Sequence, residues 1–422
     1  MFNRLFHQYK SIPHAKQVLG LFSVNIIGIP IAIITSVVVT RYLGSKDYGN
    51  YQFIISLFNL AASLFTFGFF QAGNRALVLN NDSQIAKEYY GAEVAITSAL
   101  FIVMSISLAL YAFFDPNIQE KELRTLVFFL IPFGWIFLLT TYFEALFQAD
   151  NRIRMLAQIR LYPKGGLLIA AALIYFIFMD KNFNRLSVIL TLNLTTQAII
   201  YMLVLYRLHL SFRNIKIRLI EIWNFNKSFG FHIYVGGLFT FGFFGLTGIL
   251  ISYFGLDNRG VGFYALAVSM SAPLSFIPNT IATTHYKDFS VRKRIPTKLS
   301  LITLGISFAA LIGLWIVIGP FVHFFYGKEY ATVIGLTFIV SFGRTVHGLS
   351  DYINRFLGAN GQGKALRNNA IIVGCSMLIL SLLFIPKWGE YGAAYARLIT
   401  SVVYFVSIIF FYIRFIKKGT YI

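Results

Sequence analysis

The chain has 422 residues, of which 57% are hydrophobic and only 12% are charged. Because soluble domains carry roughly a quarter charged residues, this composition excludes an ordinary soluble fold. The formal net charge of +20 comes from 36 Lys and Arg residues against 16 Asp and Glu residues.

Long apolar segments recur along the chain, and most reach the roughly 20 residues that a helix needs to cross a bilayer. We predict about twelve transmembrane helices, near residues 18–40, 51–72, 91–114, 125–147, 161–179, 187–206, 229–253, 261–282, 299–321, 331–354, 370–385 and 392–413. No cleavable signal precedes the first segment, and no hydrophilic domain interrupts the series. The sequence therefore predicts an all-α, multi-pass membrane protein.

The distribution of Lys and Arg predicts the orientation independently of hydropathy. Seven segments on one side of the predicted membrane carry 25 of the 36 basic residues, the six on the other side carry nine, and Arg344 and Arg397 lie inside helices. The positive-inside bias then places both termini and the segment 207–228 in the cytoplasm, with the protein in the cytoplasmic (inner) membrane. Nucleic-acid binding is a poor interpretation of this charge, since topology accounts for most of it.

Two short patterns recur in the two halves of the chain. Residues 41–51 (RYLGSKDYGNY) and 252–264 (SYFGLDNRGVGFY) share an aromatic residue two positions before a glycine, an acid, and a Gly-x-Tyr. Residues 146–151 (LFQADN) also resemble 356–361 (FLGANG). We predict a six-plus-six duplication: an N-terminal lobe at 1–206, a cytoplasmic amphipathic linker at 207–228 and a C-terminal lobe at 229–422. Because each repeat has an even number of spans, a parallel pseudo-twofold axis relates the two lobes.

The motifs at 41–51, at 68–75 (GFFQAGNR) and at 325–330 (FYGKEY), together with twelve spans, resemble the polysaccharide transporter family. This is the O-antigen flippase (Wzx-like) branch of the multidrug/oligosaccharidyl-lipid/polysaccharide (MOP) flippase superfamily. The resemblance implies two six-helix lobes in a MATE-like V shape. It also implies translocation of a polyprenyl-diphosphate-linked oligosaccharide from the inner to the outer leaflet by alternating access, for cell-surface polysaccharide biosynthesis. Membrane lipids are expected partners, and a polysaccharide polymerase and glycosyltransferases of the same pathway are candidate partners.

Four ionisable residues on the tenth span form one polar stripe. At about 100° per residue, Arg344, His347, Asp351 and Arg355 fall within an arc of roughly 80° around the helix. A charge at the bilayer centre costs at least about 2.5–3.5 kcal/mol, so the stripe should face protein or a watery cavity. Arginine binds diphosphate through paired, charge-assisted hydrogen bonds, which makes Arg344 and Arg355 candidate substrate-binding residues. The alternative is an i,i+4 ion pair between Asp351 and Arg355, with Arg344 bound to an acid of another helix.

Further basic and acidic residues extend this prediction to other helices. Arg397 in the twelfth span, and Arg75 and Lys164 at inner helix ends, are candidates to contact an anionic head group, although topology alone also favours basic residues there. Asp351, His347 and Glu144 are candidates for coupling to a proton or sodium gradient, with Glu93 considered beside them. Ion pairing with nearby arginines is the alternative for both glutamates.

The sequence offers little for enzyme chemistry. It has no Walker-type phosphate loop, no His-Glu-x-x-His and no Gly-x-Ser-x-Gly, and its single cysteine, Cys375, excludes an intramolecular disulfide. We therefore predict no catalytic residues, no metal site and no cofactor. Two other classes stay open: a multidrug or small-molecule exporter of the same superfamily, and a membrane acyltransferase or glycan polymerase that uses His347.

Overall fold

The computed structural model describes residues 15–80, 82–150, 152–178, 184–238 and 243–418. Within these ranges the chain forms helices and turns and no strand, which confirms the predicted all-α class. Both termini, at 1–14 and 419–422, lie outside the described residues, as do 239–242 within the predicted seventh span.

Contacts divide the chain into two compact units. Unit 1 comprises Met1–Tyr42 and Phe58–Val235, and unit 2 comprises Leu43–Leu57 and Gly236–Ile422. The predicted linker at 207–228 therefore lies within unit 1, whereas the turn after the first span belongs to unit 2.

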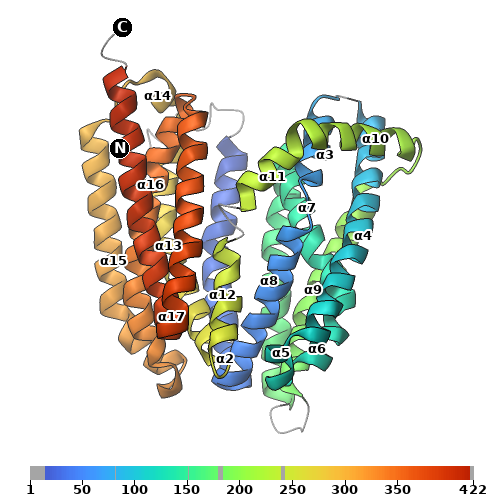
Figure 1. The fold of residues 1–422 in the computed structure, drawn as a ribbon, viewed down its shortest axis with the longest axis vertical. Helices are drawn as coiled ribbons and strands as arrows, with labels where there is room; N and C mark the ends of the chain where they lie inside the picture. The colour runs from blue at the N-terminus through green and yellow to red at the C-terminus, as the bar shows by residue number, and fades with distance from the viewer. Residues whose placement is uncertain (1–14, 81, 151, 179–183, 239–242, 419–422) are drawn as a thin grey trace. The chain divides into compact units, whose positions relative to one another are not determined.

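Helix α2 (Ala15–Leu64) runs through both units and contains the non-helical residue Gly44, at φ 76°. The remaining helices of unit 1 follow in chain order (Figure 1): α3 (Phe69–Val78), α4 (Ser83–Phe114), α5 (Pro116–Glu120), α6 (Arg124–Leu130), η1 (Ile131–Gly134), α7 (Trp135–Ala149), α8 (Ile153–Phe178), α9 (Arg185–Leu208), α10 (Ile215–Phe225), the π-helical turn η2 (Asn226–Gly230) and α11 (Phe231–Gly237), whose last two residues fall in unit 2. Unit 2 continues with α12 (Phe243–Phe254), α13 (Arg259–Thr284), α14 (Tyr286–Val291), α15 (Thr297–Phe325), η4 (Lys328–Tyr330), α16 (Thr332–Ala359) and α17 (Gly363–Lys418).

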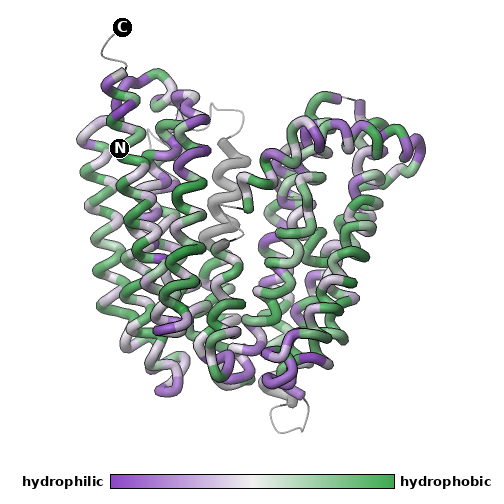
Figure 2. The backbone as a smooth tube through the Cα atoms, viewed as in Figure 1, coloured by the Kyte–Doolittle hydropathy of each residue, from purple (hydrophilic) through white to green (hydrophobic). Residues whose placement is uncertain are grey.

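Eight helical segments of the described chain are long and apolar enough to cross a membrane. Two of them, Ile27–Leu64 and Gly363–Lys417, each cover two predicted spans, joined at Gly44 and at Gly389. The two remaining predicted spans correspond to α8, which carries several basic residues, and to α11 and α12, which flank residues 239–242. Hydrophobic residues dominate the middle of the helices and polar residues gather toward their ends (Figure 2).

The repeated turns of the two halves pack against each other inside unit 2. A Cβ added to Gly49 would lie 1.9 Å from the carbonyl oxygen of Asn258, so only glycine fits this contact. The buried Asn258 side chain donates to Asn50 Oδ1 at 2.8 Å. Ser45 donates to Glu329 of the third recognised motif. These contacts support a structural role for the motif residues.

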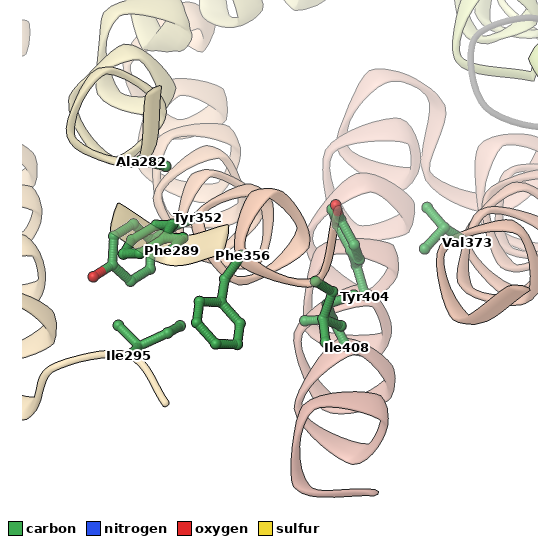
Figure 3. Packing of buried hydrophobic residues seen from close by; sticks show 9 residues of the cluster. Ala282, Phe289, Ile295, Tyr352, Phe356, Val373, Tyr404 and Ile408 are labelled. Atoms are coloured by element: carbon green, nitrogen blue, oxygen red, sulfur yellow. The ribbon is translucent and has the colours of Figure 1, made fainter. Parts of the chain in front are cut away.

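The core of unit 2 fixes the orientation of α16. Phe289 of α14 packs edge-on against Tyr352 and Phe356 of α16, at centroid distances of 5.8 and 5.4 Å. Tyr404 and Ile408 of α17 complete this buried cluster (Figure 3). With these apolar residues directed into the core, the polar stripe of α16 is turned toward α13 and α17.

The amphipathic segment forms α10, which crosses the ends of α3 and α4 (Figure 1). Arg218 of α10 donates to Glu88 of α4 at 2.9 Å and to Glu221 at 2.8 Å. These carboxylates raise the pKa of Arg218 well above its usual range. Three apolar side chains of the same helix stay exposed: Ile217, Ile220 and Trp223.

Candidate functional site

A network of hydrogen bonds joins the polar stripe of α16 to the two helices beside it. Asp351 Oδ1 accepts from the Tyr404 hydroxyl of α17 at 2.9 Å, and its Oδ2 accepts from Asn279 Nδ2 of α13 at 3.3 Å. Arg355 Nε donates to Asn279 Oδ1 at 2.9 Å. Asn279 therefore bridges Asp351 and Arg355. No direct ion pair between these two appears in the described chain, so the alternative of an i,i+4 pair is wrong.

Two arginines lie close together at the deeper end of the stripe. Arg344 is partly buried, and its buried Nε has no hydrogen-bond partner among the described residues. Arg397 of α17 lies near enough to act electrostatically on Arg344. It donates weakly to the Tyr264 hydroxyl at 3.3 Å, and its guanidinium lies 5.2 Å from the centre of the Phe244 ring.

No carboxylate forms an ion pair with either arginine within the described ranges. Asp351 is the acid that acts on Arg344, and its two oxygens are already occupied by Tyr404 and Asn279. The predicted alternative, in which an acid of another helix neutralises Arg344, is therefore wrong for this conformation. Like charges repel, so two neighbouring guanidiniums without an acid favour an anionic ligand.

His347 lies between the arginines and Asp351 and is held by aromatic rings. Its imidazole packs against Tyr404 at a centroid distance of 4.8 Å and against Phe244 at 6.2 Å. Arg344, Asp351 and Arg397 all lie near enough to influence it electrostatically. The predicted stripe and Arg397 thus come together in unit 2.

The structure adds three residues that sequence reasoning missed: Asn279, Tyr404 and Tyr264. A usable signal existed for Asn279, because it follows Pro278 as a lone amide within the apolar helix α13. The two tyrosines gave no signal, since the chain has 24 tyrosines and no spacing separates these from the rest.

The other predicted site residues belong to unit 1. Arg75 is exposed and lies over the Phe229 ring at 4.7 Å. The Lys164 side chain is exposed on α8. Glu144 accepts two hydrogen bonds from Arg160, at 2.8 and 2.6 Å, as the ion-pair alternative predicted.

Glu93 differs from Glu144. It is 1% exposed, and neither of its carboxylate oxygens has a hydrogen-bond partner in the described part of the chain. The expectation that Glu93 pairs with an arginine is therefore wrong.

The long apolar helices, with a partly buried basic cluster inside one helical unit, define a polytopic membrane protein. The family described as "Polysaccharide biosynthesis protein" matches residues 14–286, well over half of the chain. The protein belongs to this family. The whole polar stripe lies beyond the matched region, on α16, as does Arg397 on α17. A search of curated protein sequences gives no significant match.

Solved structures with the same fold are flippases and transporters. The lipid II flippase MurJ in an inward closed conformation has a TM-score of 0.69 and 14% identity, covering 92% of this chain and 86% of MurJ. A multidrug resistance MATE family transporter of the MOP superfamily in an inward-facing conformation has a TM-score of 0.67 and 12% identity, covering 92% and 96%. A MOP superfamily transporter from Pyrococcus furiosus, described as having a binding pocket of reversed polarity, has a TM-score of 0.54 and 10% identity, covering 95% and 96%. These likenesses establish the fold.

Proposed function

We propose that the protein is a flippase that moves a polyprenyl-diphosphate-linked oligosaccharide from the inner to the outer leaflet by alternating access, for cell-surface polysaccharide biosynthesis. The observation that carries this proposal is the pair Arg344 and Arg397, which lie near each other in unit 2 and have no ion-paired acid among the residues that the structure describes. The family match and the MurJ-like fold support the same class of protein.

The chemistry of the pair suits a diphosphate. Burying a guanidinium without a partner is costly, so its retention in an apolar helix indicates a ligand that compensates it. A diphosphate offers several acceptor oxygens to the planar Arg fork. In this proposal Arg355, which is exposed at the far end of the stripe, binds the diphosphate first. Arg344 then binds it deeper in the helical unit. Arg75 and Lys164 then serve to attract the head group at the inner leaflet.

The charge of the cluster disfavours the two competing classes. An exporter of organic cations should present acids toward its cargo, whereas here the carboxylate of Asp351 is occupied by Tyr404 and Asn279, and neither arginine has an ion-paired acid among the described residues. For an acyltransferase or polymerase, His347 would need an open face, but Tyr404 and Phe244 pack against its ring.

Ion coupling through Asp351 and His347 stays a prediction. Both residues contact Tyr404, so protonation of either would alter the same hydrogen-bonded contact beside Arg344. Asp351→Asn and His347→Gln should make transport insensitive to an imposed proton or sodium gradient in vesicles. Wild-type transport at one rate with and without any gradient would contradict this coupling.

The role of Arg344 is tested with purified variants in liposomes that contain a fluorescent polyprenyl-diphosphate-linked sugar. Arg344→Ala should abolish translocation, and Arg344→Lys should retain part of it, because Lys keeps the charge but loses the bidentate geometry. Arg367→Ala, which removes an exposed arginine of α17, is the matched control and should match the wild type. Thermal stability is measured on the same samples. A loss of stability in step with the loss of transport would make Arg344 a structural residue.

A further inference from the structure

Helix α10 packs against the side of the hairpin formed by α3 and α4, and not over its tip. The hairpin turns between residues 78 and 83. The contacts of α10 lie away from this turn: the Ser211 amide, just before the helix, donates to the Lys87 carbonyl at 3.0 Å, and Trp223 stacks on Phe69 with ring centroids 5.8 Å apart. The uncovered face of α10 therefore points outward from the side of unit 1 (Figure 1).

The same contacts place α10 at the level of the membrane–water interface. Helix α4 begins with a polar stretch (SQIAKE), and its apolar segment starts at residue 91. The α10 contacts fall at the boundary between these two parts. Arg218 donates to Glu88 at 2.9 Å, and Glu221 accepts from the Tyr89 hydroxyl at 2.7 Å. A helix held at this boundary lies along the plane of the interface and not across the bilayer.

The outward face of α10 combines apolar and basic side chains. At about 100° per residue, Lys216, Ile220 and Trp223 fall within an arc of about 60°. Lys227 follows about one turn later, and its Nζ lies 5.5 Å from the centre of the Trp223 ring. Ile217 adjoins this arc; Ile217, Ile220 and Trp223 are 53%, 61% and 50% exposed. We call these five residues the outer face of α10.

The charge of the outer face indicates what covers it. Neither Lys216 nor Lys227 forms an ion pair with an acid in the part of the chain that the structure describes. Glu221, the one acid in the sequence of α10, already accepts hydrogen bonds from Arg218 and Tyr89. Basic residues beside exposed Ile and Trp side chains are complementary to an anionic lipid surface, which offers phosphates above an apolar interior. An acidic protein would neutralise the lysines but would leave the apolar residues at interface depth unexplained.

We propose that the outer face of α10 binds anionic phospholipids of the leaflet around it. Ile217, Ile220 and Trp223 enter the interface, and Lys216 and Lys227 contact headgroup phosphates. Because α10 leads through η2 into α11, where the chain passes from unit 1 to unit 2, the bound lipids hold this linker at a fixed depth beside α4. The proposal requires only that the chain spans a membrane, and it is independent of the cargo proposed above.

The position of the outer face is tested with a nitroxide spin label on the full chain in liposomes of phosphatidylcholine and phosphatidylglycerol. Ile220→Cys, combined with Cys375→Ser, carries the label, and its collisions with oxygen and with a water-soluble nickel complex are compared. The label should be accessible to oxygen and shielded from nickel. Glu120→Cys in the same background labels an exposed residue of α5 and should be open to nickel. Equal nickel accessibility at the two positions would overturn the proposal, because the outer face would then lie in water.

The preference for anionic headgroups is tested by native mass spectrometry of the purified protein with phosphatidylglycerol or phosphatidylcholine. The wild type should retain phosphatidylglycerol at a several-fold lower lipid concentration than phosphatidylcholine. Lys216→Gln with Lys227→Gln should reduce this preference several-fold. Arg292→Gln with Lys293→Gln removes the same charge from the exposed turn between α14 and α15, and this matched control should keep the preference. An unchanged preference in the α10 variant, or an equal loss in the control, would overturn the proposal.

Discussion

The contact between linker helix α10 and α4 should be a major source of stability for unit 1. Arg218 and Glu88 are only 14% and 10% exposed, so removing one partner leaves the other nearly buried without its counter-charge. Breaking a buried pair typically costs about 3–5 kcal/mol. Glu88 keeps a hydrogen bond from Asn214 at 3.1 Å, and the second pair, with Glu221, is partly exposed and adds little. We therefore expect Arg218→Met to destabilise the protein by about 2–3 kcal/mol.

This loss is measured by thermal unfolding in detergent, monitored by intrinsic fluorescence, where it corresponds to roughly 5 °C. Arg213→Met is the matched control, because Arg213 is an exposed residue of the same linker. A double-mutant cycle with Glu88→Gln should show coupling of more than about 1 kcal/mol, since the two residues share one contact.

The raised pKa of Arg218 adds stability at any pH below the usual pKa of arginine, and that stability is lost only above it. Arg218 itself should thus cause no pH dependence near neutrality. Strictly additive effects, or a variant as stable as the control, would refute this account of the linker.

Two further predictions concern packing and topology. Gly49→Ala should lower the unfolding temperature markedly, because its Cβ would overlap the Asn258 carbonyl. Gly313→Ala, where the added Cβ has free space, should be neutral or stabilising. Equal effects in the two variants would contradict the packing argument. Lys216→Cys, in a background without the native cysteine, should react with a membrane-impermeant thiol reagent only from the cytoplasmic side. Labelling from outside intact cells would reverse the predicted orientation.

The sequence was sufficient for the all-α, multi-pass fold class, because the length of the apolar segments reports directly on membrane-spanning helices. The sequence also predicted correctly that the four residues of the polar stripe share one face of α16, because helical periodicity alone is enough for this prediction. These residues are Arg344, His347, Asp351 and Arg355. Sequence reasoning failed where the answer depended on a neighbouring helix. Asn279 bridges Asp351 and Arg355 in place of the alternative i,i+4 pair, a contact that no spacing within α16 reveals.

The two glutamates of unit 1 show the same limit. Glu144 and Arg160 are both predicted near inner helix ends, and the structure pairs them. Glu93 has similar sequence surroundings, yet it packs on Gly73, and its carboxylate accepts no hydrogen bond from any arginine that the structure describes. Which arginine reaches which acid is decided by how α3, α4 and α7 pack, and that information is not local in the sequence.

Direct comparison of two cargoes tests the central claim. Purified protein in liposomes is given either a labelled polyprenyl-diphosphate-linked oligosaccharide or a fluorescent organic cation, and movement across the bilayer is followed for both. The basic cluster around Arg344 and Arg397 predicts that the lipid-linked sugar crosses chemically unchanged and that the cation does not. Transport of the cation alone, or covalent alteration of the sugar, would contradict the account.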